Sequence, residues 1–142
     1  MTTKGKRVAA MAEQFRVGDL DPHYTGYFEL FNQQKFYEAH DVLEYIWLKD
    51  KQGPNGAFYK GLIQLAGAFV HLQKNRLKPS AALFNLALSN LEKYPREHEH
   101  MDIREALHLI GNWLSALELT EFKVNPLTPN ERPQLILHLP KS

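Results

Sequence analysis

Residues 36–72 decide the fold of this chain. They contain two runs with helical periodicity, FYEAHDVLEYIWL (36–48) and FYKGLIQLAGAFVHL (58–72), on either side of the segment KDKQGPNG (49–56). The glycines and the proline at the end of that segment stop a helix firmly. The pattern therefore predicts two helices, over residues 36–48 and about 57–74, which run antiparallel because their connection is short.

Both predicted helices carry polar side chains on the stripe that should face the core. On the first helix, four residues fall within a sector of about 60°, with Glu44 at its edge: Phe36, His40, Leu43 and Trp47. The second stripe consists of Ala57, Gly61, Gln64, Ala68 and His71. Buried polar groups are costly unless they satisfy one another. We therefore expect Glu44, Gln64 and His71 to face one another, with His40 at the edge of the same cluster.

Periodicity and capping signals predict four further helices, over residues 6–16, 22–32, 79–94 and 102–120. The second of these has a clear N-terminal signal, because Asp21 can cap the helix and Pro22 suits its first turn. The last starts at Asp102, which has the spacing of a capping box with Glu105. Most of the chain is therefore expected to be helical.

The pattern changes after about Thr120. Four prolines follow and exclude a long helix. Leu135, Leu137 and Leu139 alternate, which predicts a short extended segment laid over the helices. The sequence thus predicts an all-α, single-domain bundle of five or six helices with an extended proline-rich C-terminal segment. Its expected divisions are a partly helical N-terminal extension (1–20), the helical domain (21–120), and a C-terminal segment packed on the bundle (121–142).

Composition narrows the class of protein. The chain has 142 residues, of which 44% are hydrophobic and 23% charged, and its formal net charge is +1. This balance gives no clustered basic face for nucleic acid, and no apolar run approaches the roughly 20 residues that span a membrane. The chain has no cysteine, which excludes disulfides, thiolate catalysis and Cys-ligated zinc. We expect a cytoplasmic protein that binds neither nucleic acid nor membranes.

Two long motifs occur in order between residues 31 and 75. FNQQKFYEAHDVLEYIW (31–47) and FYKGLIQLAGAFVHLQKN (58–75) resemble the signature of a bacterial and archaeal family, domain-of-unknown-function 309. That signature is roughly FN-x-x-x-(F/Y)-(F/Y)-E-A-H-E-x-L-E-x-x-W, followed by G-L-I-Q-x-A-x-A-x-x-H. The resemblance covers residues 28–94 well and the C-terminal PQLIL (133–137) more loosely. It departs at Asp41, where the family more often has glutamate. It implies an all-helical single domain that can self-associate, and it implies no particular function.

One interpretation of the polar stripes is a binding or scaffold module without enzymatic activity. Gly61 and Ala68 would let the neighbouring helix approach closely, so that Gln64 and His71 could hydrogen-bond with Glu44 or His40. Trp47 would add bulk and an N–H that also needs a partner. Such a cluster would organise the fold or line a groove, and the residues favour this interpretation. Its small-molecule or protein partner is left open.

The alternative is a metal-dependent, hydrolase-like enzyme. His40, Glu44 and His71 would form a two-histidine, one-carboxylate site for a divalent zinc, iron or manganese ion. Glu38 or Asp41 could add an oxygen ligand or act as a general base. Regulation through a partner protein is a third interpretation.

Overall fold

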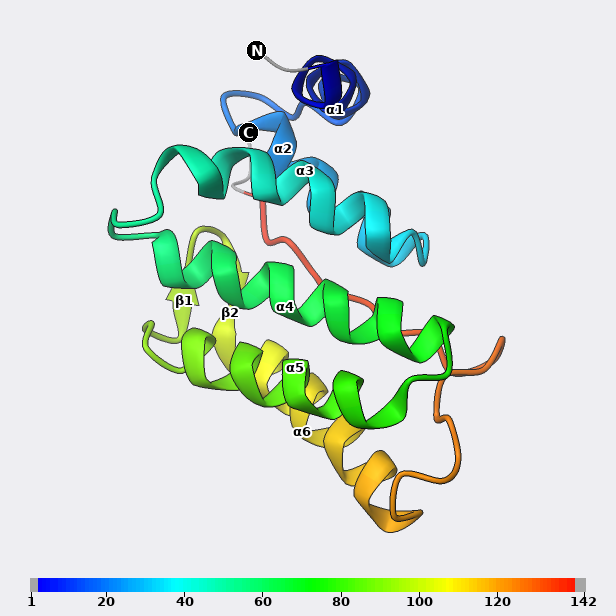
Figure 1. Ribbon diagram of the computed structural model, residues 1–142. Helices are drawn as coiled ribbons and strands as arrows, with labels where there is room; N and C mark the ends of the chain where they lie inside the picture. Colours follow the sequence, from blue (N-terminus) through cyan, green and yellow to red (C-terminus); the bar gives the residue numbers. More distant parts are fainter. Residues whose placement is uncertain (1–2, 140–142) are drawn as a thin grey trace.

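The computed structural model describes residues 3–139, which form a helical bundle with one small hairpin (Figure 1). The helices are α1 (Thr3–Glu13), α2 (Pro22–Asn32), α3 (Phe36–Lys49), α4 (Gly56–Gln73), α5 (Leu77–Leu91) and α6 (Ile103–Leu119). The antiparallel strands β1 (Glu97–His98) and β2 (Met101–Asp102) precede α6. The predicted all-α bundle is therefore confirmed. Nowhere in residues 3–139 is a helix long and apolar enough to cross a bilayer.

Helices α3, α4 and α5 lie side by side in the order of the sequence (Figure 1). Helix α2 packs against α3, α6 packs against α5, and α1 lies across α2 and α3. The C-terminal segment, drawn in orange and red, runs back behind these helices toward α2. Its Leu135 is only 5% exposed.

The core is organised around the ring of Phe69 on α4. Aromatic rings from four other helices lie 5.0 to 5.5 Å from it, centroid to centroid: Phe31 of α2, Phe36 of α3, Phe84 of α5 and Trp113 of α6. Three of these pairs are edge-to-face and the Phe36 pair is stacked, geometries that are favourable for aromatic rings. Phe69 thus contacts an aromatic ring from each of the other helices except α1.

Helix boundaries follow the capping signals, with two differences. Asp21 accepts a hydrogen bond from the backbone N–H of His23, and Asp102 accepts one from that of Glu105. Helix α5 begins at Leu77, before Pro79, because a proline fits anywhere in a first turn, where its missing N–H has no helical partner. Helix α1 covers 3–13 rather than the expected 6–16.

Candidate functional site

The polar residues of α3 meet α1 instead of α4. Lys4 of α1 places its Nζ 3.5 Å from Asp41 Oδ1 and 3.7 Å from Glu44 Oε1. The ring of His40 lies between the same two carboxylates, with Nδ1 3.2 Å from Asp41 Oδ1 and Nε2 3.8 Å from Glu44 Oε2. These four residues form what we call the α1–α3 cluster. It consists of two carboxylates that share a lysine and a histidine.

A cavity of about 460 Å³ opens beside the α1–α3 cluster. Three members of the cluster line it together with Gly5, Val8, Tyr45, Leu48 and Lys49. The Asp41 side chain is only 8% exposed, whereas that of Glu44 is 29% exposed and that of Lys4 is 50% exposed. Negative charge therefore lies at the base of this α1–α3 pocket, and the lysine reaches it from the solvent side.

Tyr45 forms an aromatic wall of the pocket that is fixed by its neighbours. The ring of His23 on α2 stacks on it with 4.3 Å between centroids and 9° between planes. Lys49 Nζ lies 4.1 Å from the centre of the tyrosine ring and 3.0 Å from its hydroxyl oxygen. His23 Nδ1 is 2.9 Å from Asp21 Oδ1, and this hydrogen bond lowers the pKa of Asp21. The wall is therefore held from both α2 and α3.

Gln64 is turned toward α5, which differs from the expectation that it faces Glu44. Its Oε1 accepts a hydrogen bond from Asn90 Nδ2 at 2.8 Å. The small residues of α4 explain this difference, because they pack against α5. A Cβ on Gly61 would lie 2.9 Å from Leu91 Cγ, and the carbonyl of Ala68 accepts a hydrogen bond from a side chain of α5. The closely packed face of α4 therefore belongs to the α4–α5 contact.

The remaining predicted residues lie apart from the α1–α3 cluster. Trp47 interacts through its ring with Lys60 and Lys51, whose Nζ atoms lie 4.3 and 5.1 Å from the ring centroid. Glu38 is exposed and makes no side-chain hydrogen bond or ion pair within residues 3–139. His71 has a buried Nδ1 without a hydrogen-bond partner in the described part of the chain. Burial lowers the pKa of His71, and the charges of two nearby cationic side chains lower it further.

The structure brings together two members of the expected metal-ligating trio. His40 and Glu44 are neighbours, but His71 makes no described contact with either of them. Among residues 3–139, no group of three or more His, Asp or Glu side chains is arranged to hold a metal ion. The three-ligand site at His40, Glu44 and His71 is therefore not assembled, because Glu44 pairs with Lys4 of α1 and with His40 of its own helix.

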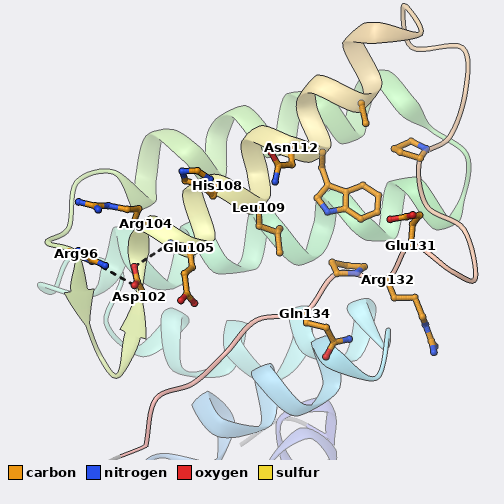
Figure 2. A pocket seen from close by; sticks show the side chains of 14 residues that line it. Arg96, Asp102, Arg104, Glu105, His108, Leu109, Asn112, Glu131, Arg132 and Gln134 are labelled. Atoms are coloured by element: carbon orange, nitrogen blue, oxygen red, sulfur yellow. Dashed lines mark hydrogen bonds and ion pairs between the residues drawn. The ribbon is translucent and has the colours of Figure 1, made fainter.

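A larger cavity of about 790 Å³ lies between α6 and the C-terminal segment (Figure 2). In Figure 2, Glu105 and Leu109 project from α6 toward the segment that carries Gln134. Arg96 Nε lies 3.7 Å from Asp102 Oδ2 at one end of the cavity. No residue predicted as part of a site lines this cavity. Two of the predicted site residues, Asp41 and Glu44, instead line the smaller α1–α3 pocket.

Sequence reasoning missed Lys4 and Tyr45 as parts of the site. Lys4 belongs to a short basic run near the N-terminus, and such runs are most often solvated. Only its spacing within an amphipathic α1, where Val8 and Ala12 are buried, could have placed it on an inward edge. Tyr45 and Lys49 have helical i, i+4 spacing, which was a usable signal for their contact.

The geometry of the cluster is suited to binding a cation. Two carboxylates converge on one ammonium group, and the buried one needs a positive partner because an unpaired charge is costly to bury. His40 has both ring nitrogens directed at carboxylates. The cavity adds apolar surface next to this charge.

Comparison with known proteins agrees with the sequence motifs. The family model described as Domain of unknown function (DUF309) matches residues 24–83. No curated protein and no solved structure matches the chain. The matched range contains most of α2, all of α3 and α4 and the start of α5, and thus Asp41 and Glu44, whereas Lys4 and the C-terminal segment lie outside it. The resemblance to DUF309 is therefore confirmed over residues 24–83.

Proposed function

We propose that the protein is a non-enzymatic binding module that recognises an organic cation in the α1–α3 pocket. The observation that carries this proposal is the buried carboxylate of Asp41, which sits at the base of a cavity and is paired with a half-exposed lysine. A buried carboxylate retains its need for a positive partner whether that partner comes from the chain or from a ligand. Lys4 marks the position that a ligand ammonium group would take.

The exposure of Lys4 makes its ion pair replaceable. Ion pairs with a solvent-exposed lysine contribute little net free energy, about 0–1 kcal/mol, because the ammonium group is well solvated outside the pair. A ligand that brings an ammonium group together with apolar surface can therefore compete with Lys4. This competition would free the flexible lysine side chain and fill the cavity beside it.

The residues that line the pocket indicate what non-polar group the ligand carries besides its ammonium group. Val8 and Leu48 supply aliphatic surface, and Tyr45 supplies an aromatic face. Burial of a ligand methylene group contributes about 0.8 kcal/mol. A primary amine with a short aliphatic or aromatic body is therefore the ligand class that fits charge and surface together.

His40 favours binding over catalysis at this site. A histidine that ligates a metal or acts as a general base needs a free ring nitrogen directed at the metal or substrate. Nδ1 of His40 is held by Asp41 at 3.2 Å, Nε2 lies 3.8 Å from Glu44 of the same helix, and His40 is not among the residues that line the α1–α3 pocket. This arrangement supports a role for His40 in positioning the two carboxylates.

Calorimetric titration with n-hexylammonium chloride tests the proposal, with sodium hexanoate as the probe of opposite charge. We expect saturable binding of the amine and none of the carboxylate. Glu44→Gln should weaken amine binding about tenfold, because one charge-assisted hydrogen bond is lost. Glu38→Gln is the matched control, since it removes the same charge from an exposed position on the same helix.

Three results would contradict the proposal. The first is the absence of saturable heat with the amine. The second is equal binding of amine and hexanoate, which would indicate apolar binding alone. The third is an equal loss of affinity in Glu38→Gln and Glu44→Gln, which would indicate a general effect of net charge.

A further inference from the structure

The C-terminal segment, residues 131–139, is held across the end of α2 in the way that an extended peptide is held by a receptor. The amide of Asn32 contacts both backbone groups of Leu135. Asn32 Nδ2 donates to the Leu135 carbonyl oxygen at 2.8 Å, and the Leu135 N–H donates to Asn32 Oδ1 at 2.7 Å. Hydrogen bonds to the main chain give affinity for an extended peptide irrespective of its side chains.

Two further contacts fix the same backbone on either side of Leu135. Gln34 Nε2 donates to the carbonyl oxygen of Pro133 at 3.0 Å. Toward the C-terminus, an isolated antiparallel bridge joins Leu137 to Met101 of β2. The end of α2 and strand β2 therefore form the two walls of one groove, which we call the tail groove.

Side chains of the segment alternate between the groove and solvent. Pro133 is buried and Leu135 is 5% exposed, whereas Ile136 is 57% exposed. Leu137 again packs against the core. In an extended chain, alternate side chains point to the same side. The groove thus selects the pattern Pro-x-Leu-x-Leu.

The groove and its occupant come from different parts of the chain. Asn32 and Gln34 lie inside the family match over residues 24–83, and the occupying segment lies outside it. Gln34 has a φ of 67°, in the left-handed region that residues with a Cβ seldom adopt. This conformation belongs to the Schellman turn that ends α2, in which the N–H of Gln34 donates to the carbonyl oxygen of Phe31 and the N–H of Lys35 donates to that of Leu30.

A surface loop separates the segment from the rest of the bundle. Asn125 anchors the chain before this loop, because its Nδ2 donates to the carbonyl oxygen of Leu72 at 2.6 Å. The exposed residues 128–132 form the orange loop that projects from the molecule in Figure 1. The segment can therefore leave the groove without displacing α6, as a local opening of the structure.

We propose that the tail groove is a peptide-binding site for an extended Pro-x-Leu-x-Leu segment, and that the tail of a second copy of this chain can occupy it. The occupant is identified by the segment already seated there, since an identical segment from another copy makes the same contacts. Exchange of an identical element between protomers costs little, because no contact is lost. The resident tail competes through its high effective concentration. The exchange goes beyond the amine site and uses none of its residues.

Cysteine cross-linking in the full chain tests the exchange, and the absence of native cysteine gives a clean background. Gln34→Cys and Gln134→Cys are introduced into separate chains, which are mixed at high concentration and oxidised mildly. We expect a disulfide-linked dimer of the two variants. Gln52→Cys, at an exposed loop position, replaces Gln34→Cys in the control for random collision. A chain that carries both groove cysteines should close an internal disulfide, which checks the geometry.

Peptide binding provides a second, independent measurement. A fluorescent peptide with the sequence of residues 130–139, NERPQLILHL, is titrated against the full-length Leu135→Asp protein, in which the resident tail is weakened. We expect binding about tenfold tighter than to the wild-type protein, whose own tail competes. Adding Asn32→Ala should abolish this binding.

The proposal fails if the mixed cysteine variants give no more dimer than the Gln52→Cys control while the double variant closes internally. If the double variant does not close, the peptide titration decides. Binding that is equal with and without Asn32→Ala, or no binding to Leu135→Asp, overturns the proposal. Circular dichroism verifies that each variant is folded, and Leu135→Ala replaces Leu135→Asp if the aspartate unfolds the protein.

Discussion

His71 is a titratable side chain near the end of α4 whose protonation the fold disfavours. Its Nδ1 is buried without a hydrogen-bond partner in residues 3–139, and burial together with the charges of Arg76 and Lys74 lowers its pKa. The unfolded chain therefore binds this proton more readily than the folded protein does. By proton linkage, stability is fully present above the unfolded pKa of about 6.5 and declines as the pH falls below it.

Replacement of His71 should make the protein less sensitive to mild acid. We expect the melting temperature of the wild-type protein to fall between about pH 7.5 and 5.5, and to fall less in His71→Leu. Thermal melts followed by circular dichroism at both pH values measure the difference. His108→Leu, at an exposed position on α6, is the control variant. Parallel pH profiles of wild type and His71→Leu would refute this role of His71.

At the scale of the helices, replacing either of two glycines by alanine should change the stability of the protein in opposite directions. A Cβ on Gly61 would lie 2.9 Å from Leu91 Cγ and 3.2 Å from Asn90 Cβ, whereas a Cβ on Gly111 of α6 would meet nothing within 4 Å. Gly61→Ala should therefore destabilise the protein by about 1–3 kcal/mol through overpacking. Gly111→Ala should stabilise it by about 0.5–1 kcal/mol, because alanine suits a helix better than glycine. Urea unfolding measures both, and a stabilising Gly61→Ala would show that α4 and α5 can move apart.

The contact at Gly61 also shows how far the sequence predicts this fold. Helices α2 to α6 were predictable because periodicity and caps such as Asp21 are local signals. In contrast, the helix against which such a stripe packs is not specified by local sequence. Gly61 and Ala68 indicated that a helix approaches α4 closely, but nothing in the sequence specified α5 over α3. That choice turns Gln64 toward Asn90 and leaves the carboxylates of α3 to another partner.

The candidate site was partly predictable for the same reason. His40, Asp41 and Glu44 are close in sequence on one helix, and their proximity follows from helical spacing. Lys4 completes the cluster from α1, and its approach depends on how α1 packs across α3. Spacing within a helix was therefore informative, whereas the pairing between helices required the structure.

The whole molecule depends on contacts that several helices share. Phe69 joins the rings of α2, α3, α5 and α6, and Tyr27 of α2 donates its hydroxyl to the carbonyl oxygen of Leu62 on α4 at 2.6 Å. Loss of packing at one of these positions exposes surface on several helices at once. The described bundle should therefore unfold as one unit, with α1 and the C-terminal segment as the parts able to detach locally.

The buried tyrosines determine how the stability of the folded bundle falls at high pH. Burial raises the pKa of Tyr27 well above its ordinary value, and burial likewise raises the pKa of Tyr24. The unfolded chain loses these protons near pH 10, whereas the folded protein keeps them. Stability is therefore fully present below about pH 10 and is lost as the pH rises further, by about 1.4 kcal/mol per tyrosine at pH 11.

Tyr27→Phe separates this titration from the hydrogen bond to Leu62. At about pH 8 the variant should be less stable than the wild type by roughly 1 kcal/mol, the net contribution of one hydrogen bond. Toward about pH 11 the difference should disappear or reverse, because only the wild type has this buried hydroxyl to ionise on unfolding. Urea unfolding at both pH values measures the difference, with the exposed Tyr37→Phe as control. A constant difference between the two pH values would mean that Tyr27 ionises as readily in the folded protein as in the unfolded chain, so that the core admits water at high pH.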